Sequence, residues 1–280
     1  MNQFKFEMRG RAFEDGDRLD KVVAGLSGVQ HFFDGTFKAI TERSRISKRD
    51  RETYHVIIRD YQDGSFIAYL GMVLSGIQPA LPLVGNVATP DNVWAMTFQA
   101  VEFLKKVYAL ARAKENYRIE QDGNNNTAVV CGDQRHTYNG PVLHIANLII
   151  GSLRELDDVL DSDEVESIRL TGPSDESVNL DFEDKGQFYP PVTVHEEPVD
   201  LRCDVFDFNK YENLGRAAIP EHENIPPGNY KFRNIGSQDV EEFILSMTES
   251  SVKIRCLIKF EHDPLTEKKI SELLILAIAA

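Results

Sequence analysis

The chain has 280 residues, of which 45 are acidic and 31 basic, so its net charge is −14. Hydrophobic residues make up 42% and charged residues 27% of the sequence. These values are ordinary for a globular protein and exclude a disordered chain, a collagen and a disulfide-rich miniprotein. So acidic a chain is also a poor match for a protein that coats nucleic acid with its whole surface. The length predicts one large domain or two smaller ones.

The N-terminal part of the chain alternates between strand and helix patterns. Residues 3–13 alternate in polarity as a strand does, and residues 19–40 repeat apolar side chains every three or four positions, which predicts an amphipathic helix. Asp63-Gly64 lies between two apolar runs and predicts a hairpin turn. Thr89-Pro90-Asp91 predicts the start of a second helix. These elements predict an N-terminal α+β domain over residues 1–115.

The stretch between Asp63 and Asp91 contains no charge and is long enough to cross a bilayer. Proline and glycine interrupt it, and Phe66–Leu70 is typical of a strand, so we expect a buried strand and loop rather than a membrane span. The N-terminus has no apolar core typical of a secretory signal, and the three cysteines are far apart. These features predict a cytoplasmic protein with buried, unpaired thiols.

The rest of the chain divides into three further segments. Residues 116–185 predict a small α+β module with a third amphipathic helix and two short strands. Three prolines in residues 186–200 predict an extended linker. Five strand patterns and one short helix, Gln238–Met247 capped by Ser237, predict a β-rich barrel or sandwich over residues 201–280. The predicted fold class is therefore α+β.

Charge is segregated along the sequence. Residues 1–119 carry a net charge of +3, whereas residues 151–200 carry −12. The basic loop 43–51 could bind phosphates or an acidic partner, or it could be an ordinary solvated loop. Its cations are Arg43, Arg45, Lys48, Arg49 and Arg51. The acidic counterpart surrounds the end of the third helix, where negative charge opposes the helix dipole. Its residues are Asp157, Asp158, Asp161, Asp163 and Glu164.

Three explanations remain open for the acidic residues: a basic partner surface, a divalent ion, or a solvated and fraying helix end. The spacing of an EF-hand calcium loop is absent. Opposite charges on one chain would also allow head-to-tail self-association.

No motif in the sequence indicates a particular reaction. Walker, dinucleotide-binding, nucleophile-elbow and zinc-protease motifs are all missing. Cys131, Asp133, Arg135 and His136 lie together before the third helix, but Asp133 and Gln134 suit a turn equally well. Glu183-Asp184-Lys185 has the letters of a nuclease motif but lies near the linker rather than inside an apolar strand. We expect no cofactor or metal, and a catalytic site stays unknown.

The expected function is therefore a non-enzymatic component of a protein assembly, in stress or phage defence. It would bind a protein partner, or a second copy of itself, through its segregated charges. Nucleic acid is expected only at the 43–51 loop, and membrane binding is not expected. The alternatives are a metal-dependent hydrolase or nuclease, and a nucleotide or small-molecule sensor that uses the C-terminal barrel.

Several short motifs resemble those of uncharacterised bacterial proteins that have an N-terminal α/β domain and a β-rich C-terminal module. The motifs are a Phe-x-Phe strand and Gly-Arg-Ala-Phe turn at the start, Asp-Gly-Ser-Phe at 63–66, Gly-Asn-Asn-Asn-Thr at 123–127, Ile-Pro-Pro-Gly-Asn-Tyr-Lys-Phe at 225–232, and Asp-Pro-Leu-Thr at 263–266. That family has no assigned activity. The resemblance implies a bacterial cytosolic origin and carries over no catalytic residue.

Overall fold

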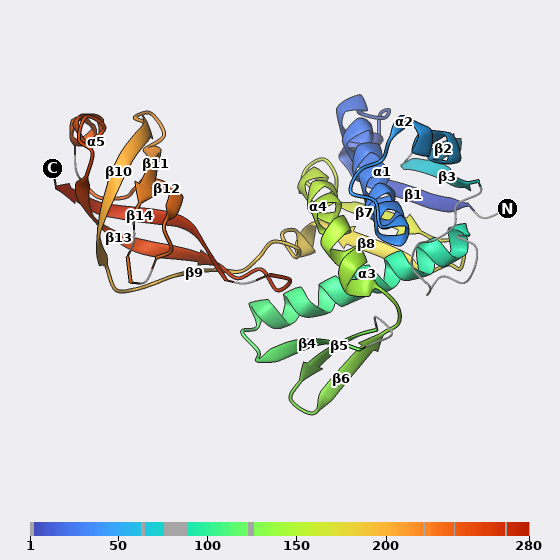
Figure 1. Cartoon of the computed structure of the whole chain (residues 1–280). Coiled ribbons are helices and arrows are strands. Elements are labelled where there is room, and N and C mark those ends of the chain that lie inside the picture. The colour runs from blue at the N-terminus through green and yellow to red at the C-terminus, as the bar shows by residue number, and fades with distance from the viewer. Residues whose placement is uncertain are drawn as a thin grey trace. The chain divides into compact units, whose positions relative to one another are not determined.

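The computed structural model describes residues 3–62, 65–75, 89–122, 126–220, 222–223, 225–237, 239–266 and 268–279. Its contacts divide the chain into two compact units, residues 1–189 and 190–280 (Figure 1). Both helices and strands contribute throughout, which confirms the predicted α+β fold class. The predicted hairpin turn at Asp63-Gly64 lies outside the described residues.

A five-stranded antiparallel sheet forms the centre of the first unit, with the strand order β2-β3-β1-β7-β8. The strands are β1 (Phe4–Arg9), β2 (Tyr54–Gln62), β3 (Phe66–Leu74), β7 (Ser167–Thr171) and β8 (Ser177–Asp181). Strand β1 pairs with β3 on one side and with β7 on the other. Strands from residues 1–115 and 116–185 therefore share one sheet.

Three long helices pack in the first unit: α1 (Leu19–Thr41), α3 (Pro90–Arg112) and α4 (Val142–Val159). They confirm the three predicted helices. The ring of Phe4 on β1 lies 5.0 Å from that of Phe33 on α1 and 5.7 Å from that of Trp94 on α3. Helices α1 and α4 approach closely at Gly35, where a Cβ atom would lie 2.7 Å from the Leu148 carbonyl oxygen. Large aromatic rings between sheet and helices thus form the core.

Shorter elements complete the first unit. They are two 3-10 turns, η1 (Arg11–Phe13) and η3 (Phe182–Asp184), the helix α2 (Lys48–Thr53), and a small sheet of β4 (Tyr117–Gln121), β5 (Thr127–Cys131) and β6 (Gln134–Tyr138). The small sheet contacts α3, since the ring of Tyr138 lies 5.5 Å from that of Phe103. Helix α2 was not expected, because the basic segment 43–51 was predicted as a loop.

The uncharged stretch between Asp63 and Asp91 contributes β3, which confirms the strand predicted at Phe66–Leu70. Its residues 76–88 lie outside the described residues. Within the described ranges, no helix has both the length and the apolar composition needed to cross a bilayer.

The second unit is a closed five-stranded barrel, which confirms the predicted β-rich region and decides between the barrel and the sandwich that the sequence left open. Its strands are β10 (Val199–Asn209), β11 (Leu214–Ile219), β12 (Gly228–Asn234), β13 (Val252–Glu261) and β14 (Lys269–Ala279). They follow the order β10-β11-β12-β14-β13, and β13 pairs back onto β10 to close the barrel. The pair β12–β14 is parallel and the others are antiparallel. A short strand, β9 (Val192–Val194), extends the sheet at β13.

Helix α5 (Val240–Ser246) packs against the barrel through Phe243, which is fully buried. Its ring lies 4.9 Å from that of Phe208 and 5.9 Å from that of Phe232, in a stacked group of three. The N-cap is Asp239, whose carboxylate accepts a hydrogen bond from the Glu241 N–H at 3.2 Å. The prediction of Ser237 as the cap was wrong, because the helix begins later than the apolar pattern suggested.

Candidate functional site

The basic segment 43–51 forms a tight corner between α1 and β2. Helix α1 ends where Glu42 adopts a left-handed conformation (φ 54°) and the Arg43 N–H donates to the Lys38 carbonyl at 3.0 Å. Ser47 then caps α2: its hydroxyl accepts from the Asp50 N–H at 3.3 Å, and the Asp50 carboxylate accepts from the Ser47 N–H at 2.8 Å. This reciprocal capping box turns the predicted loop into a short helix.

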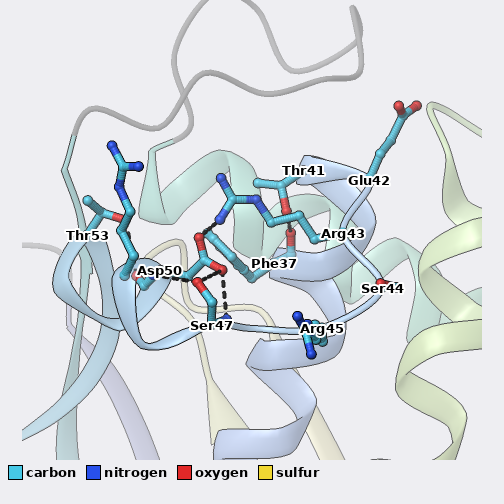
Figure 2. A pocket seen from close by; sticks show the side chains of 10 residues that line it. Phe37, Thr41, Glu42, Arg43, Ser44, Arg45, Ser47, Asp50 and Thr53 are labelled. Atoms are coloured by element: carbon cyan, nitrogen blue, oxygen red, sulfur yellow. Dashed lines mark hydrogen bonds and ion pairs between the residues drawn. The ribbon is translucent and has the colours of Figure 1, made fainter.

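Arg43 is fixed within this corner. Its guanidinium pairs with the Asp50 carboxylate, which is almost completely buried, and lies 5.9 Å from the centre of the Phe37 ring. Figure 2 shows Arg43 directed at Asp50, with Ser47 beside that carboxylate. The charge of Arg43 is therefore largely satisfied inside the protein.

Arg51 is fixed on the opposite side of α2. Its guanidinium forks onto the Asp34 carboxylate of α1, with Nη1 2.8 Å from Oδ1 and Nη2 on Oδ2. The hydrogen bond to Asp34 raises the pKa of Arg51 although partial burial lowers it. The same cation lies 5.6 Å from the centre of the Tyr54 ring. Arg51 thus joins α2 to the core rather than facing a partner.

The remaining three cations of the segment, Arg45, Lys48 and Arg49, are exposed. Within the part of the chain that the structure describes, none of them has a carboxylate within ion-pair distance. Arg45, which Figure 2 labels, lines a hollow of about 860 Å³, and Arg49 lines it as well. Its described lining is Phe37, Thr41, Glu42, Arg43, Ser44, Arg45, Ser47, Arg49, Asp50 and Thr53. We call it the arginine hollow.

A second hollow of about 520 Å³ adjoins the first. The two share Glu42, Arg43 and Ser44, and the second continues to His144 and Leu148 on α4. The surface beside the basic segment therefore extends from α2 to α4.

The acidic residues predicted as the opposite pole do not form one exposed surface. Asp157 is fully buried, and its Oδ2 accepts a hydrogen bond from the Gly186 N–H at 2.6 Å. Its Oδ1 atom has no hydrogen-bond partner among the residues that the structure describes. Burial raises the pKa of Asp157, and the hydrogen bond from Gly186 offsets only part of that rise.

The other predicted acidic residues mostly hold local structure. Asp158 accepts from the Tyr189 hydroxyl at 2.7 Å, and the Asp161 carboxylate accepts from the Asp163 N–H at 2.9 Å. Glu164 lies 2.7 Å from the Lys21 ammonium and also contacts Arg18. Only Asp163 is both exposed and without a side-chain contact of this kind among the described residues. These residues brace the end of α4 internally.

The residues considered for catalysis lie on two separate elements: Cys131, Arg135 and His136 are on the β5–β6 hairpin, and Glu183 and Asp184 are in η3. Cys203 and Cys256 are buried in the barrel, and burial raises the pKa of each thiol to about 12. Arg135 on β6 pairs with Glu120 at 2.5 Å. Among the described residues, no three His, Cys, Asp or Glu side chains are grouped so that they could hold a metal ion.

Sequence reasoning missed a third hollow, of about 490 Å³, on the barrel. Three exposed cations line it: Arg216 on β11, and Lys231 and Arg233 on β12. Buried and exposed residues alternate along these strands, with Ala217 and Phe232 on the inner face. This alternation predicts that Arg216, Lys231 and Arg233 share the outer face, and it could have revealed the hollow from the sequence.

Comparisons with protein-family models, curated proteins and solved structures find no match to this chain. The resemblance based on short motifs stays a prediction. The site therefore has to be interpreted from its own chemistry.

Proposed function

We propose that the protein is a non-enzymatic binding protein that holds an acidic segment of a protein partner at the arginine hollow. The supporting observation is that Arg45, Lys48 and Arg49 have no ion-pair partner among the described residues, while the backbone that carries them is fixed by the Ser47–Asp50 capping box. A carboxylate-rich segment would gain these contacts without displacing an internal ion pair. Electrostatic complementarity of this kind favours specificity and fast association.

The expected contribution of the three cations follows from their exposure. An exposed ion pair is worth about 0.2–1 kcal/mol, so three pairs together contribute about 0.6–3 kcal/mol. This corresponds to a change of about 3- to 150-fold in the dissociation constant. Because the pairs are exposed, we expect the affinity to fall as salt shortens the screening length.

The buried and braced acidic residues of α4 give no support to head-to-tail self-association, so we favour a separate partner. We place this role in a bacterial cytoplasmic assembly, in stress or phage defence; the bacterial and cytosolic setting is what the resemblance of the short motifs implies. The charged lining of the hollow, with Arg45 and Arg49 beside Ser44 and Ser47, suits a polar peptide better than a membrane surface.

The test is a titration of the full chain with a fluorescein-labelled peptide of ten glutamates, followed by fluorescence anisotropy. We expect the triple variant Arg45→Ala, Lys48→Ala, Arg49→Ala to weaken binding by at least threefold. A matched control removes three exposed cations from the barrel, Arg202→Ala, Lys253→Ala and Arg255→Ala, and should leave binding almost unchanged. Equal losses in both variants would show that only net charge matters, and would refute the proposal.

A further inference from the structure

The connectivity of the barrel narrows what it is suited to hold. The first three strands of the barrel, β10, β11 and β12, pair in chain order. The fifth strand, β14, pairs in parallel with the third, β12. The fourth strand, β13, pairs with the first, β10. The single helix α5 lies between the third and fourth strands. This is the arrangement of the OB fold, whose second and third strands often carry oligonucleotides or oligosaccharides. A fold alone does not assign a ligand, so the ligand has to be inferred from the residues on that face.

The third hollow lies on this face, over β10, β11, β12 and β14. Arg216 on β11 and Lys231 on β12 are directly opposite each other in the antiparallel ladder, and both point outward. Like charges in directly opposite positions repel and destabilise the pairing of two strands. An anionic group bound between the two side chains would remove that repulsion.

Two exposed aromatic side chains belong to strand β10 and the loop that follows it. Tyr211, in the loop between β10 and β11, is 86% exposed, and its N–H is held by the Asn209 side chain at 3.0 Å. The Lys210 ammonium lies 5.1 Å from the centre of its ring. Phe206, at the irregularity in β10, is 47% exposed. Exposed rings beside cations are the combination on which unpaired bases stack.

The carboxylates near the hollow are partly neutralised. Glu272 on β14 lies 3.4 Å from Arg233 and 3.3 Å from the Lys259 ammonium, and Asp207 lies 3.9 Å from Arg216. Three cations line the hollow, and Lys210 and Lys259 lie beside it, which makes five. The carboxylates number three: Asp207, Glu212 and Glu272. These five cations and three carboxylates give the face a charge of +2. Because residues 190–280 carry a net charge of −6 in total, the rest of the unit carries −8. This face is therefore positive while the rest of the unit is negative on balance. A second pair of exposed cations, Arg202 and Lys253, lies directly opposite each other on the β10–β13 ladder and serves below as a control.

We propose that the β11–β12 face of the barrel binds single-stranded nucleic acid. Phosphates lie between Arg216 and Lys231, and a base stacks on Tyr211. A neutral oligosaccharide would leave the repulsion between the two cations in place, which is why the observations favour the charged polymer. This inference is independent of the proposed function, because the arginine hollow belongs to the first unit.

The test uses the full chain and a fluorescein-labelled strand of twenty thymidines, followed by anisotropy at about 50 and 200 mM NaCl. We expect Tyr211→Ala to weaken binding by at least about fivefold through lost stacking, with the salt dependence unchanged. We expect Arg216→Ala with Lys231→Ala to weaken binding and to reduce the slope of log K against log [salt] by about 1.4, since each cation contributes about 0.7 on a single strand.

Matched controls separate this site from general effects. Tyr61→Ala removes a tyrosine of the first unit that is 62% exposed, and Arg202→Ala with Lys253→Ala removes two exposed cations from β10 and β13. Both should leave the affinity within twofold of the parent. The proposal is overturned if the strand does not bind, if the controls weaken binding as much as the barrel variants do, or if a 20-bp duplex or a neutral hexasaccharide binds in preference. It is also overturned if the Arg45, Lys48, Arg49 triple variant abolishes strand binding while the barrel variants retain it.

Discussion

Replacing Arg51 by alanine would separate the structural cations of the basic segment from the binding ones. The Asp34 carboxylate is only 8% exposed and receives two hydrogen bonds from the Arg51 guanidinium. In Arg51→Ala, the Gln30 amide, at 2.6 Å, would still donate to Asp34 but carries no charge. The variant therefore leaves a nearly buried negative charge without its cation.

The size of the effect follows from the exposure of the pair. Breaking a fully buried ion pair costs about 3–5 kcal/mol, and a hydrogen bond to a charged group contributes about 1.5–3 kcal/mol. The Arg51 side chain is 40% exposed, so the lower range applies and we expect a loss of about 2 kcal/mol. For a unit of 189 residues, this lowers the melting temperature by about 4–8 °C.

The single tryptophan of the chain makes the measurement specific. Trp94 is fully buried in the first unit, so its fluorescence during thermal unfolding follows that unit alone. Arg49→Ala is the matched control, since Arg49 is exposed, and should change stability by less than about 0.5 kcal/mol. An unchanged melting temperature in Arg51→Ala, or an equal fall in Arg49→Ala, would refute the division between structural and binding cations.

Three further predictions concern packing and pH. In Gly172→Ala the new Cβ would clash with the Trp94 Nε1 atom, so we expect a loss of about 1–3 kcal/mol and altered tryptophan emission; unchanged emission would contradict this packing. Burial raises the pKa of Asp157, so the folded state holds the proton more tightly than the unfolded chain, and stability should fall as pH rises above the ordinary value of 3.8. Asp157→Asn should remove that fall in urea unfolding curves measured from acidic to neutral pH, and an unchanged pH profile would count against it. Phe243→Ala should cost about 3–5 kcal/mol and lower the calorimetric transition of the barrel without moving the fluorescence transition of Trp94; a shift of both would show that the two units unfold together.

Much of the fold follows from local patterns. The three long helices and the barrel strands could be predicted because side chains three or four apart, or two apart, decide which face is buried. Helix α2 was missed although Ser47 and Asp50 have the capping-box spacing, because six residues give no apolar periodicity. Barrel closure could not be predicted, since it depends on pairing β10 with β13 across more than forty residues.

The candidate site was predictable in position but not in detail. The sequence shows five cations in nine residues, but not that Asp50 and Asp34 neutralise Arg43 and Arg51. Asp157 illustrates the same difficulty, because the adjacent Asp158 is exposed while Asp157 itself is buried and accepts a hydrogen bond from the Gly186 N–H. Which charges stay free is decided by contacts between distant segments, and those contacts leave no pattern in the sequence.

The central position of β1 has a consequence for synthesis of the chain. One neighbour, β3, is made soon afterwards, but the other, β7, follows only after about 160 more residues. At about 5–20 residues per second on the ribosome, β1 would wait about 8–32 seconds for that neighbour. During this time its hydrogen-bonding edge would be unsatisfied and open to wrong pairing, so nascent copies of the protein are expected to depend on chaperones that shield such edges.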